Sequence, residues 1–482
     1  MFVIAVNVLV KPIWVFFIDR TVQNTVSGGS YGTYQALLSL SIIFQTVLDF
    51  GISSYNSRRI SQNPDTLPTL FPAMLSARLV LMVVYMVLAY AWAYAFGYRG
   101  WELQLLIGVL LVQSLNSLVS FIRSNVAALH RFKTDGLLSV IDRLLAILIC
   151  GFLLVWPATA KHFRIEWFVI TQVVCYFIAA IIGYLILRRI GKVRLSFSFQ
   201  PAEILKIAKQ SFPYALLIFL MSIYNRADAM MIERLCADGK DQAGIWAAAF
   251  RLLDMANILG LMFATMLLPM FGRMLGQKND VQPIVKLCVN MLLPFSFMIA
   301  VAAVFFSADI MDLLYHKSSL YNQGAVTQAE YHWVFTILML SFPAWCLMYV
   351  YSTLLTANGS LATLNKIALA GVVLNLTLNF ILIPNYKAVG GAATSFITQT
   401  SLAIAFIIYA SRIIKLRFNI KWILAQLGYL TIVICTAFVI NTSLYNVDWK
   451  LRLTMLGMLS IGYMFLFRFF SIASIRQFLK MS

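Results

Sequence analysis

The stretch Trp167–Leu187, WFVITQVVCYFIAAIIGYLIL, decides the fold class. It contains no charged residue, and its length matches the roughly 20 apolar residues that an α-helix needs to cross a bilayer. Glu166 precedes it and Arg188 follows it, so the nearest charges stand where such a helix would leave the hydrocarbon. The segment therefore predicts a transmembrane helix.

The composition extends this prediction to the whole chain. Of its 482 residues, 61% are hydrophobic and 11% are charged, with a net charge of +19. A soluble domain typically has about 25% charged residues, so this chain has too few charges to cover a water-facing surface. We expect an all-α polytopic membrane protein, which excludes a soluble enzyme and a nucleic-acid-binding protein.

About fourteen stretches have the length and apolar character of a spanning helix. They cover residues 1–18, 31–51, 73–96, 103–122, 136–156, 167–187, 213–232, 243–268, 287–306, 333–356, 367–383, 391–410, 423–441 and 451–470. The pair 367–383 and 391–410 is the least regular, because Pro384, Gly390 and Gly391 interrupt it.

A basic segment divides these spans into two halves. We expect an N-terminal six-helix lobe over 1–187, a cytoplasmic amphipathic linker over 188–212, a C-terminal six-helix lobe over 213–410 and two additional transmembrane helices over 411–482. Each half begins with a proline-bounded span, a charged pair, a short loop and a Gly-x-aromatic sequence. This order indicates an internal repeat, which suits a transporter with its site between the halves.

The basic residues of the loops predict the orientation. One alternate set of loops, which includes 188–212, carries about twice as many Lys and Arg residues as the other set. The positive-inside rule makes that set cytoplasmic. We therefore expect both termini to be cytoplasmic, and the loops are too short to fold a catalytic domain.

Several charged residues fall within predicted spans, where a charge usually faces a cavity or a partner. From a rise of about 1.5 Å per residue, Lys11, Arg226 and Arg251 are expected at a similar depth in the outer half of the membrane. A guanidinium binds phosphate oxygens bidentately and stays protonated. These three residues are the candidate binding site for a substrate diphosphate.

The same residues have an alternative interpretation as neutralised pairs. Asp254 lies three residues after Arg251 and shares its helix face, and Asp228 is the second candidate partner. Either carboxylate could instead bind H⁺ or Na⁺ and couple transport to an ion gradient. Arg78, Arg143 and Asp49 are expected near the cytoplasmic interface.

The sequence predicts no cofactor or metal site. The six cysteines form no Cys-x-x-Cys motif and the four histidines are dispersed, which favours small core residues over ligands. A phosphate-binding loop of the GxxxxGK[ST] type is also absent from the sequence. We expect a transporter and not an enzyme.

The chain resembles the multidrug/oligosaccharidyl-lipid/polysaccharide exporter superfamily, and within it the polysaccharide-transporter branch of O-antigen-type flippases. The resemblance covers most of the chain and rests on the order and spacing of short motifs. These are YGTY (31–34), DFGI (49–52), NRAD (225–228), AGIWAAAFRLL (243–253), NLTLNFILIP (375–384) and GGAA (390–393). The chain departs from the family pattern at Lys387, where the Tyr-Gly pair common in the family is replaced by Tyr386-Lys387.

The resemblance implies a protein of the bacterial inner membrane that moves an undecaprenyl-diphosphate-linked oligosaccharide to the outer leaflet. It implies alternating access of two lobes around a cationic cavity, and polysaccharide polymerase or chain-length proteins as partners. One alternative is a multidrug or cation antiporter of the same superfamily, which would favour cavity acids over arginines. The other is a membrane enzyme of polysaccharide assembly, which would need a large loop or an intramembrane His or Asp cluster.

Overall fold

The fold is all-α in a computed structural model. The structure describes residues 10, 13–49, 60, 64–129, 131–193, 196, 201–417 and 419–469, with the backbone alone at 64, 132, 201–211, 259, 265, 269 and 325. Ten helices of the described residues are long and apolar enough to cross a membrane. The predicted fold class, a polytopic all-α membrane protein, is confirmed.

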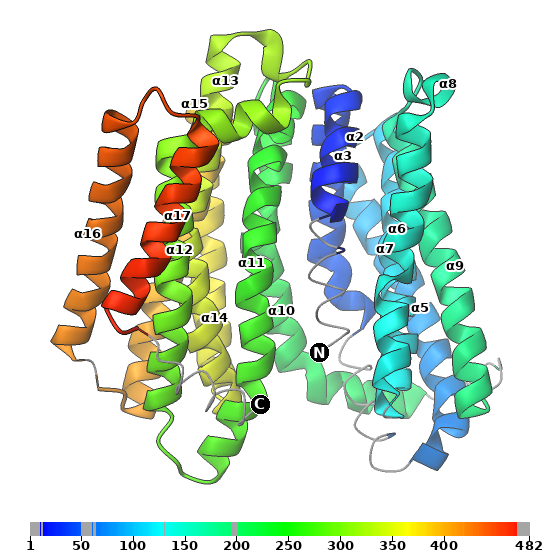
Figure 1. The fold of residues 1–482 in the computed structure, drawn as a ribbon. Helices are drawn as coiled ribbons and strands as arrows, with labels where there is room; N and C mark the ends of the chain where they lie inside the picture. The colour runs from blue at the N-terminus through cyan, green and yellow to red at the C-terminus, as the bar shows by residue number, and fades with distance from the viewer. Residues whose placement is uncertain are drawn as a thin grey trace. The chain divides into compact units, whose positions relative to one another are not determined.

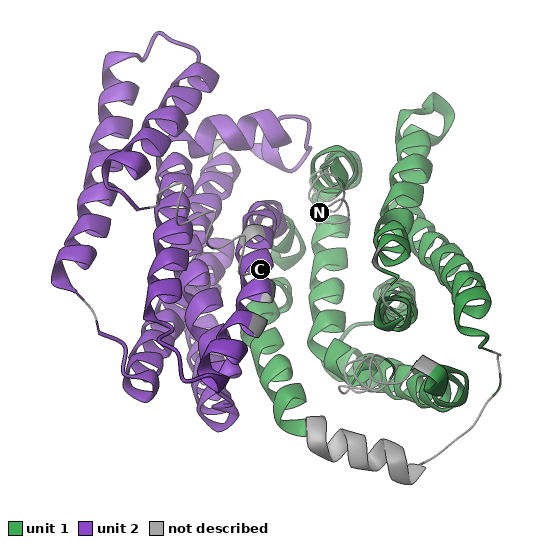
Figure 2. Ribbon diagram, turned by 60° about the horizontal axis from the view of Figure 1, so that its bottom comes forward, with its two compact units in different colours: residues 1–234, 238–244 green, residues 235–237, 245–482 purple. Residues whose placement is uncertain are grey.

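The chain forms two compact units (Figure 2), one of residues 1–234 and 238–244 and the other of 235–237 and 245–482. The elements of unit 1 are η1 (Trp14–Asp19), α2 (Arg20–Thr25), α3 (Gly28–Phe44), η2 (Gln45–Leu48), η3 (Pro64–Thr66), α5 (Leu67–Ala95), α6 (Trp101–Ala128), α7 (Phe132–Val155), α8 (Pro157–Ala160), α9 (Ile165–Gly191) and α10 (Pro201–Leu235). Helices α6, α7 and α9 pack side by side in this unit (Figure 1).

Unit 2 takes most of α11 (Gly239–Gly276), whose first residues belong to unit 1. Its other elements are α12 (Gln282–Tyr315), η4 (Tyr321–Gln323), α13 (Ala325–Leu340), α14 (Phe342–Ala357), α15 (Leu361–Ile414), α16 (Ile420–Ser443) and α17 (Trp449–Leu466). The last two helices pack on α12 through a core that includes Phe306, Tyr429 and Leu456. They are therefore part of unit 2.

The compact units divide the chain at a different place from the predicted lobes. The lobe boundary was expected at 188–212, whereas α10 and the start of α11 belong to unit 1. The reason is local packing, because the first turn of α11 lies against α3, as described below. The lobes remain a prediction about which helices move together.

Helix boundaries differ from the predicted spans where a polar residue is buried. The span 1–18 begins outside the described residues, and the helix continues beyond it through α2 to Thr25. Asp19, the first residue after the predicted span, is 7% exposed and accepts a hydrogen bond from the Tyr31 hydroxyl at 3.3 Å. A carboxylate with such a donor can lie inside a helix bundle.

The irregular pair 367–383 and 391–410 forms the two arms of α15. The helix breaks at Lys387, with φ 52° and ψ −132°. A Cβ on Gly390 would lie 2.4 Å from the carbonyl oxygen of Leu382, so the two arms can meet there only because residue 390 has no side chain. The predicted interruption is therefore a tight helical hairpin.

Candidate functional site

The structure places the predicted site residues on two helices. Arg226 and Asp228 lie on α10 in unit 1, and Arg251 and Asp254 lie on α11 in unit 2. Asp228 is fully buried, and the other three are partly buried. Lys11 lies outside the described residues, so a shared cationic cavity remains a prediction.

Arg251 has a defined environment within unit 2. The Asp254 carboxylate and the Tyr315 phenol are close enough to interact with it electrostatically. Tyr315 is the last residue of α12, and its hydroxyl donates to the carbonyl oxygen of Ala248 on α11 at 3.2 Å. The contact fixes the end of α12 beside the turn that carries Arg251.

A second charged cluster lies inside unit 1. Arg143 and Asp142 on α7 are 3.6 Å apart, and the Arg143 guanidinium lies 5.2 Å from the ring centre of Trp14. Asp19 and Tyr34 interact electrostatically with the same guanidinium. Arg143 therefore belongs to a polar cluster that reaches the first helix. Its side chain is 35% exposed, and the interfacial position expected for it remains a prediction.

Arg78 is also internal. Its side chain is 1% exposed and forms an ion pair with Asp49. It donates to the carbonyl oxygen and hydroxyl of Ser117 at 2.5 and 2.8 Å, and its guanidinium lies 4.9 Å from the ring centre of Phe121. The expected interfacial position of Arg78 was wrong, because these partners satisfy the charge inside the bundle.

An ion-pair network joins the α5–α6 loop and the first turn of α6 to the end of α10 and the start of α11. We call it the Glu102 cluster, and it consists of Tyr98, Glu102, Glu233, Arg234 and Lys240. The Glu102 carboxylate accepts from Arg234 at 3.0 Å and from Lys240 at 2.8 Å. Arg234 also lies 3.5 Å from Glu233 and 3.4 Å from the ring centre of Tyr98.

Tyr98 completes the cluster. Its hydroxyl donates to the Glu233 carboxylate. Burial, followed by the negative charge of Glu233, raises the pKa of Tyr98 well above its usual value. The phenol therefore keeps its proton at physiological pH and continues to donate.

The first turn of α11 crosses α3 at very close range beside this cluster. A Cβ on Gly32 would lie 1.8 Å from the carbonyl oxygen of Lys240 and 2.7 Å from the amide nitrogen of Gly244. The Gln23 side chain donates to the carbonyl oxygen of Gly244 at 3.0 Å. Gly32 had been singled out only as part of the YGTY motif, and the crossing gives its position a steric reason.

A buried polar seam follows the α15 hairpin and was missed by the sequence analysis. Asn375 and Asn379 on the first arm are fully buried, as are Thr394 and Thr398 on the second. Asn379 donates to Asn375 at 3.2 Å. The spacing of four residues on each arm could have indicated a polar helix face.

A family model and several solved structures match the chain. A model of the family described as polysaccharide biosynthesis protein matches residues 2–275. No curated protein sequence matches the chain.

Solved structures show the shared fold at low identity. A lipid II flippase, MurJ, in an inward closed conformation is 15% identical with a TM-score of 0.72, covering 96% of this chain and 98% of MurJ. An inward-facing MATE-family multidrug resistance transporter of the MOP superfamily is 12% identical, with a TM-score of 0.64 and coverage of 83% and 94%. A MOP superfamily transporter from Pyrococcus furiosus is 13% identical, with a TM-score of 0.58 and coverage of 85% and 94%.

Proposed function

Because the chain belongs to the polysaccharide biosynthesis protein family, we propose that it moves a lipid-linked oligosaccharide across the bacterial inner membrane. The expected substrate is an undecaprenyl-diphosphate oligosaccharide used for a surface polysaccharide such as O-antigen, and both termini are expected in the cytoplasm. The observation that carries the proposal is the flippase fold over 96% of a chain from this family. The proposed role is transport and not catalysis.

The proposed headgroup site consists of Arg226 and Arg251, together with Lys11. Both arginines lie partly buried on consecutive helices. A guanidinium binds two phosphate oxygens at once, and reduced solvent screening strengthens the attraction to a diphosphate. The proposal predicts that a charge-preserving Arg→Lys substitution retains part of the activity, since only the bidentate geometry is lost.

Asp228 and Asp254 are proposed as sites for a coupling ion. Asp228 is the stronger candidate, because it is fully buried on α10 and burial of a carboxylate favours a bound proton or cation over an isolated charge. Transport measured with imposed proton or sodium gradients tests the proposal. Asp228→Asn should remove the gradient dependence while the unstimulated rate persists.

The Glu102 cluster and the Gly32 crossing are proposed to close the transport path at its outer end. Helices α3 and α6 belong to the predicted N-terminal lobe, whereas α10 and α11 begin the predicted C-terminal lobe. Contacts between these helices must therefore break if the lobes separate on that side. The loops involved belong to the set predicted to face outward.

Deleting the gene in its host tests the substrate directly. The lipid-linked oligosaccharide should accumulate on the cytoplasmic side and reach the outer leaflet again when the wild-type gene is restored. Arg226→Ala and Arg251→Ala should fail to restore export although they insert at normal levels. Lys161→Ala, which removes an exposed cation after α8, is the matched control.

Normal glycan export in the deletion strain would contradict the flippase function. Because the fold is shared with MATE transporters, drug sensitivity should be measured in the same strain. Increased sensitivity with unchanged glycan export would instead support the antiporter alternative.

A further inference from the structure

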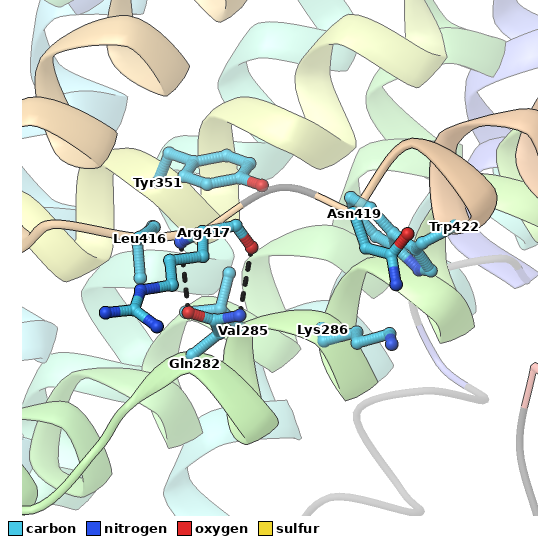
Figure 3. A pocket seen from close by; sticks show the side chains of 8 residues that line it. All are labelled: Gln282, Val285, Lys286, Tyr351, Leu416, Arg417, Asn419 and Trp422. Atoms are coloured by element: carbon cyan, nitrogen blue, oxygen red, sulfur yellow. Dashed lines mark hydrogen bonds between the residues drawn. The ribbon is translucent and has the colours of Figure 1, made fainter.

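Unit 2 contains a partly open cavity that is remote in sequence from the proposed headgroup residues. It lies where α12 and α16 begin and α15 ends, and it also reaches α14. The lining residues are Gln282, Val285, Lys286, Tyr351, Leu416, Arg417, Asn419 and Trp422 (Figure 3).

The walls of the cavity are held by specific hydrogen bonds. The Gln282 side chain donates to the carbonyl oxygen of Arg417 at 2.9 Å and accepts from its amide at 3.0 Å. On the other side, the Trp422 indole donates to the Asn290 side chain at 2.6 Å. The loop between α15 and α16 is therefore fixed on α12, and the cavity is a built feature of unit 2.

The cavity has a strong positive charge. Lys286 and the Arg417 guanidinium lie on opposite sides of the Gln282 amide (Figure 3), and both side chains are exposed. Within the described ranges, neither side chain forms an ion pair. Lys415 follows α15 and Lys421 lies in the first turn of α16. The nearest acid in sequence, Asp280, caps the start of α12 through the amide of Gln282.

Tyr351 supplies a hydroxyl donor to this cationic cavity. Its side chain is 1% exposed, and its hydroxyl points from α14 toward the side of the loop that carries Asn419 (Figure 3). Among the residues that the structure describes, the hydroxyl has no hydrogen-bond partner. The hydroxyl can therefore donate to an acceptor oxygen that enters the cavity.

We propose that this cavity binds the phosphate group of an anionic phospholipid. The two cations and the Tyr351 hydroxyl match the charge and the acceptor oxygens of a phosphodiester. Both basic loops that meet here are predicted to be cytoplasmic, on the side where anionic lipids attract basic segments.

The surface next to the cavity favours a lipid over free phosphate. Along α16, Ile420, Leu424 and Leu427 are 65%, 58% and 52% exposed, and their spacing places them on one helix face. An acyl chain can follow this face while Trp422 lies at the headgroup level, as tryptophans do at membrane interfaces. The proposal does not depend on the transported substrate.

Lipid binding to the purified full-length protein, measured by native mass spectrometry, tests the proposal. Phosphatidylglycerol should bind more tightly than zwitterionic phosphatidylcholine. In Lys286→Ala/Arg417→Ala this affinity should fall about 25-fold, since each basic residue near an anionic headgroup contributes about five-fold. Tyr351→Phe should weaken binding about five-fold through the loss of one hydrogen bond, and it keeps the ring that packs in the core.

Arg412→Ala is the matched control, because Arg412 is an exposed cation at the end of α15 that does not line the cavity. It should leave phosphatidylglycerol binding unchanged. An equal loss in this variant, or wild-type binding in both cavity variants, would overturn the proposal. Inorganic phosphate and glycerol 3-phosphate should not displace the lipid, and displacement by either would assign the cavity to a soluble phosphate.

Discussion

At the residue scale, buried charges in unit 1 are stabilised by neighbours that the sequence does not identify. Arg78 lies within an apolar run, and its depth alone suggested an interfacial side chain. Its partners are Asp49, directly after η2, and Ser117 on α6. Sequence distance hides such contacts, because a predicted span gives the depth of a residue but not the helix it faces.

The Arg78–Asp49 pair should make a measurable contribution to stability. Arg78→Met leaves Asp49, which is 39% exposed, without its partner. Because water reaches this carboxylate, we expect a cost of about 1–2 kcal/mol, between that of a surface pair and that of a fully buried pair. Unfolding by denaturant in micelles should show a loss of about this size. Adding Asp49→Asn should recover part of the loss, and a double variant as unstable as the sum of both single variants would contradict the pairing.

Lys387 shows a departure from the family pattern that has a physical consequence. It replaces the glycine of the usual Tyr-Gly pair, yet its φ of 52° lies in the region that favours glycine. Such a conformation costs a residue with a side chain about 1 kcal/mol or more. Lys387→Gly should therefore raise the stability of unit 2 by about 1 kcal/mol, as measured by thermal unfolding in micelles. Lower stability would show that the lysine side chain outweighs the strain.

At the element scale, long apolar helices could be predicted from sequence and close helix crossings could not. Spans such as 167–187 coincide with helices, here α9, because composition alone determines which segments can lie in a bilayer. The crossing of α3 and α11 depends on one missing side chain at Gly32. The YGTY motif includes Gly32, but it does not indicate that the start of α11 packs against this residue.

Gly32→Ala should force α3 and the start of α11 apart. The added Cβ would lie 1.8 Å from a backbone oxygen, and a backbone atom cannot give way as a flexible side chain can. We expect loss of export and increased protease access at the α10–α11 loop. Gly272→Ala is the matched control on α11, because no atom lies within 4 Å of its new Cβ. If both variants export and resist protease equally, the close crossing at Gly32 is not required for transport.

At the scale of the whole molecule, the sequence indicated two halves and the polytopic class, whereas the compact units follow packing. The end of α10 and the start of α11 pack in unit 1 through the Glu102 cluster. The sequence analysis used loop charges only to predict the orientation in the membrane. Pairing between distant loops is a tertiary property, so composition and spacing could not show it.

Glu102→Gln should favour opening on the side of the Glu102 cluster. Cys236 lies two residues after Arg234 and is partly exposed, and Cys435 is the exposed thiol. In a Cys435→Ser background, labelling of Cys236 by an impermeant maleimide should rise about five-fold, as expected for the loss of about 1 kcal/mol of ion pairing. Asp65→Asn, at an exposed acid elsewhere in unit 1, should label like its parent.

The central claim is that arginines on α10 and α11 bind the diphosphate of a lipid-linked oligosaccharide during its transfer between leaflets. Purified protein in liposomes should make an undecaprenyl-diphosphate oligosaccharide accessible to an enzyme added outside, at a rate that Arg226→Ala/Arg251→Ala abolishes and Lys161→Ala preserves. Transfer at the wild-type rate by the double arginine variant, or no transfer by the wild-type protein, would contradict the claim.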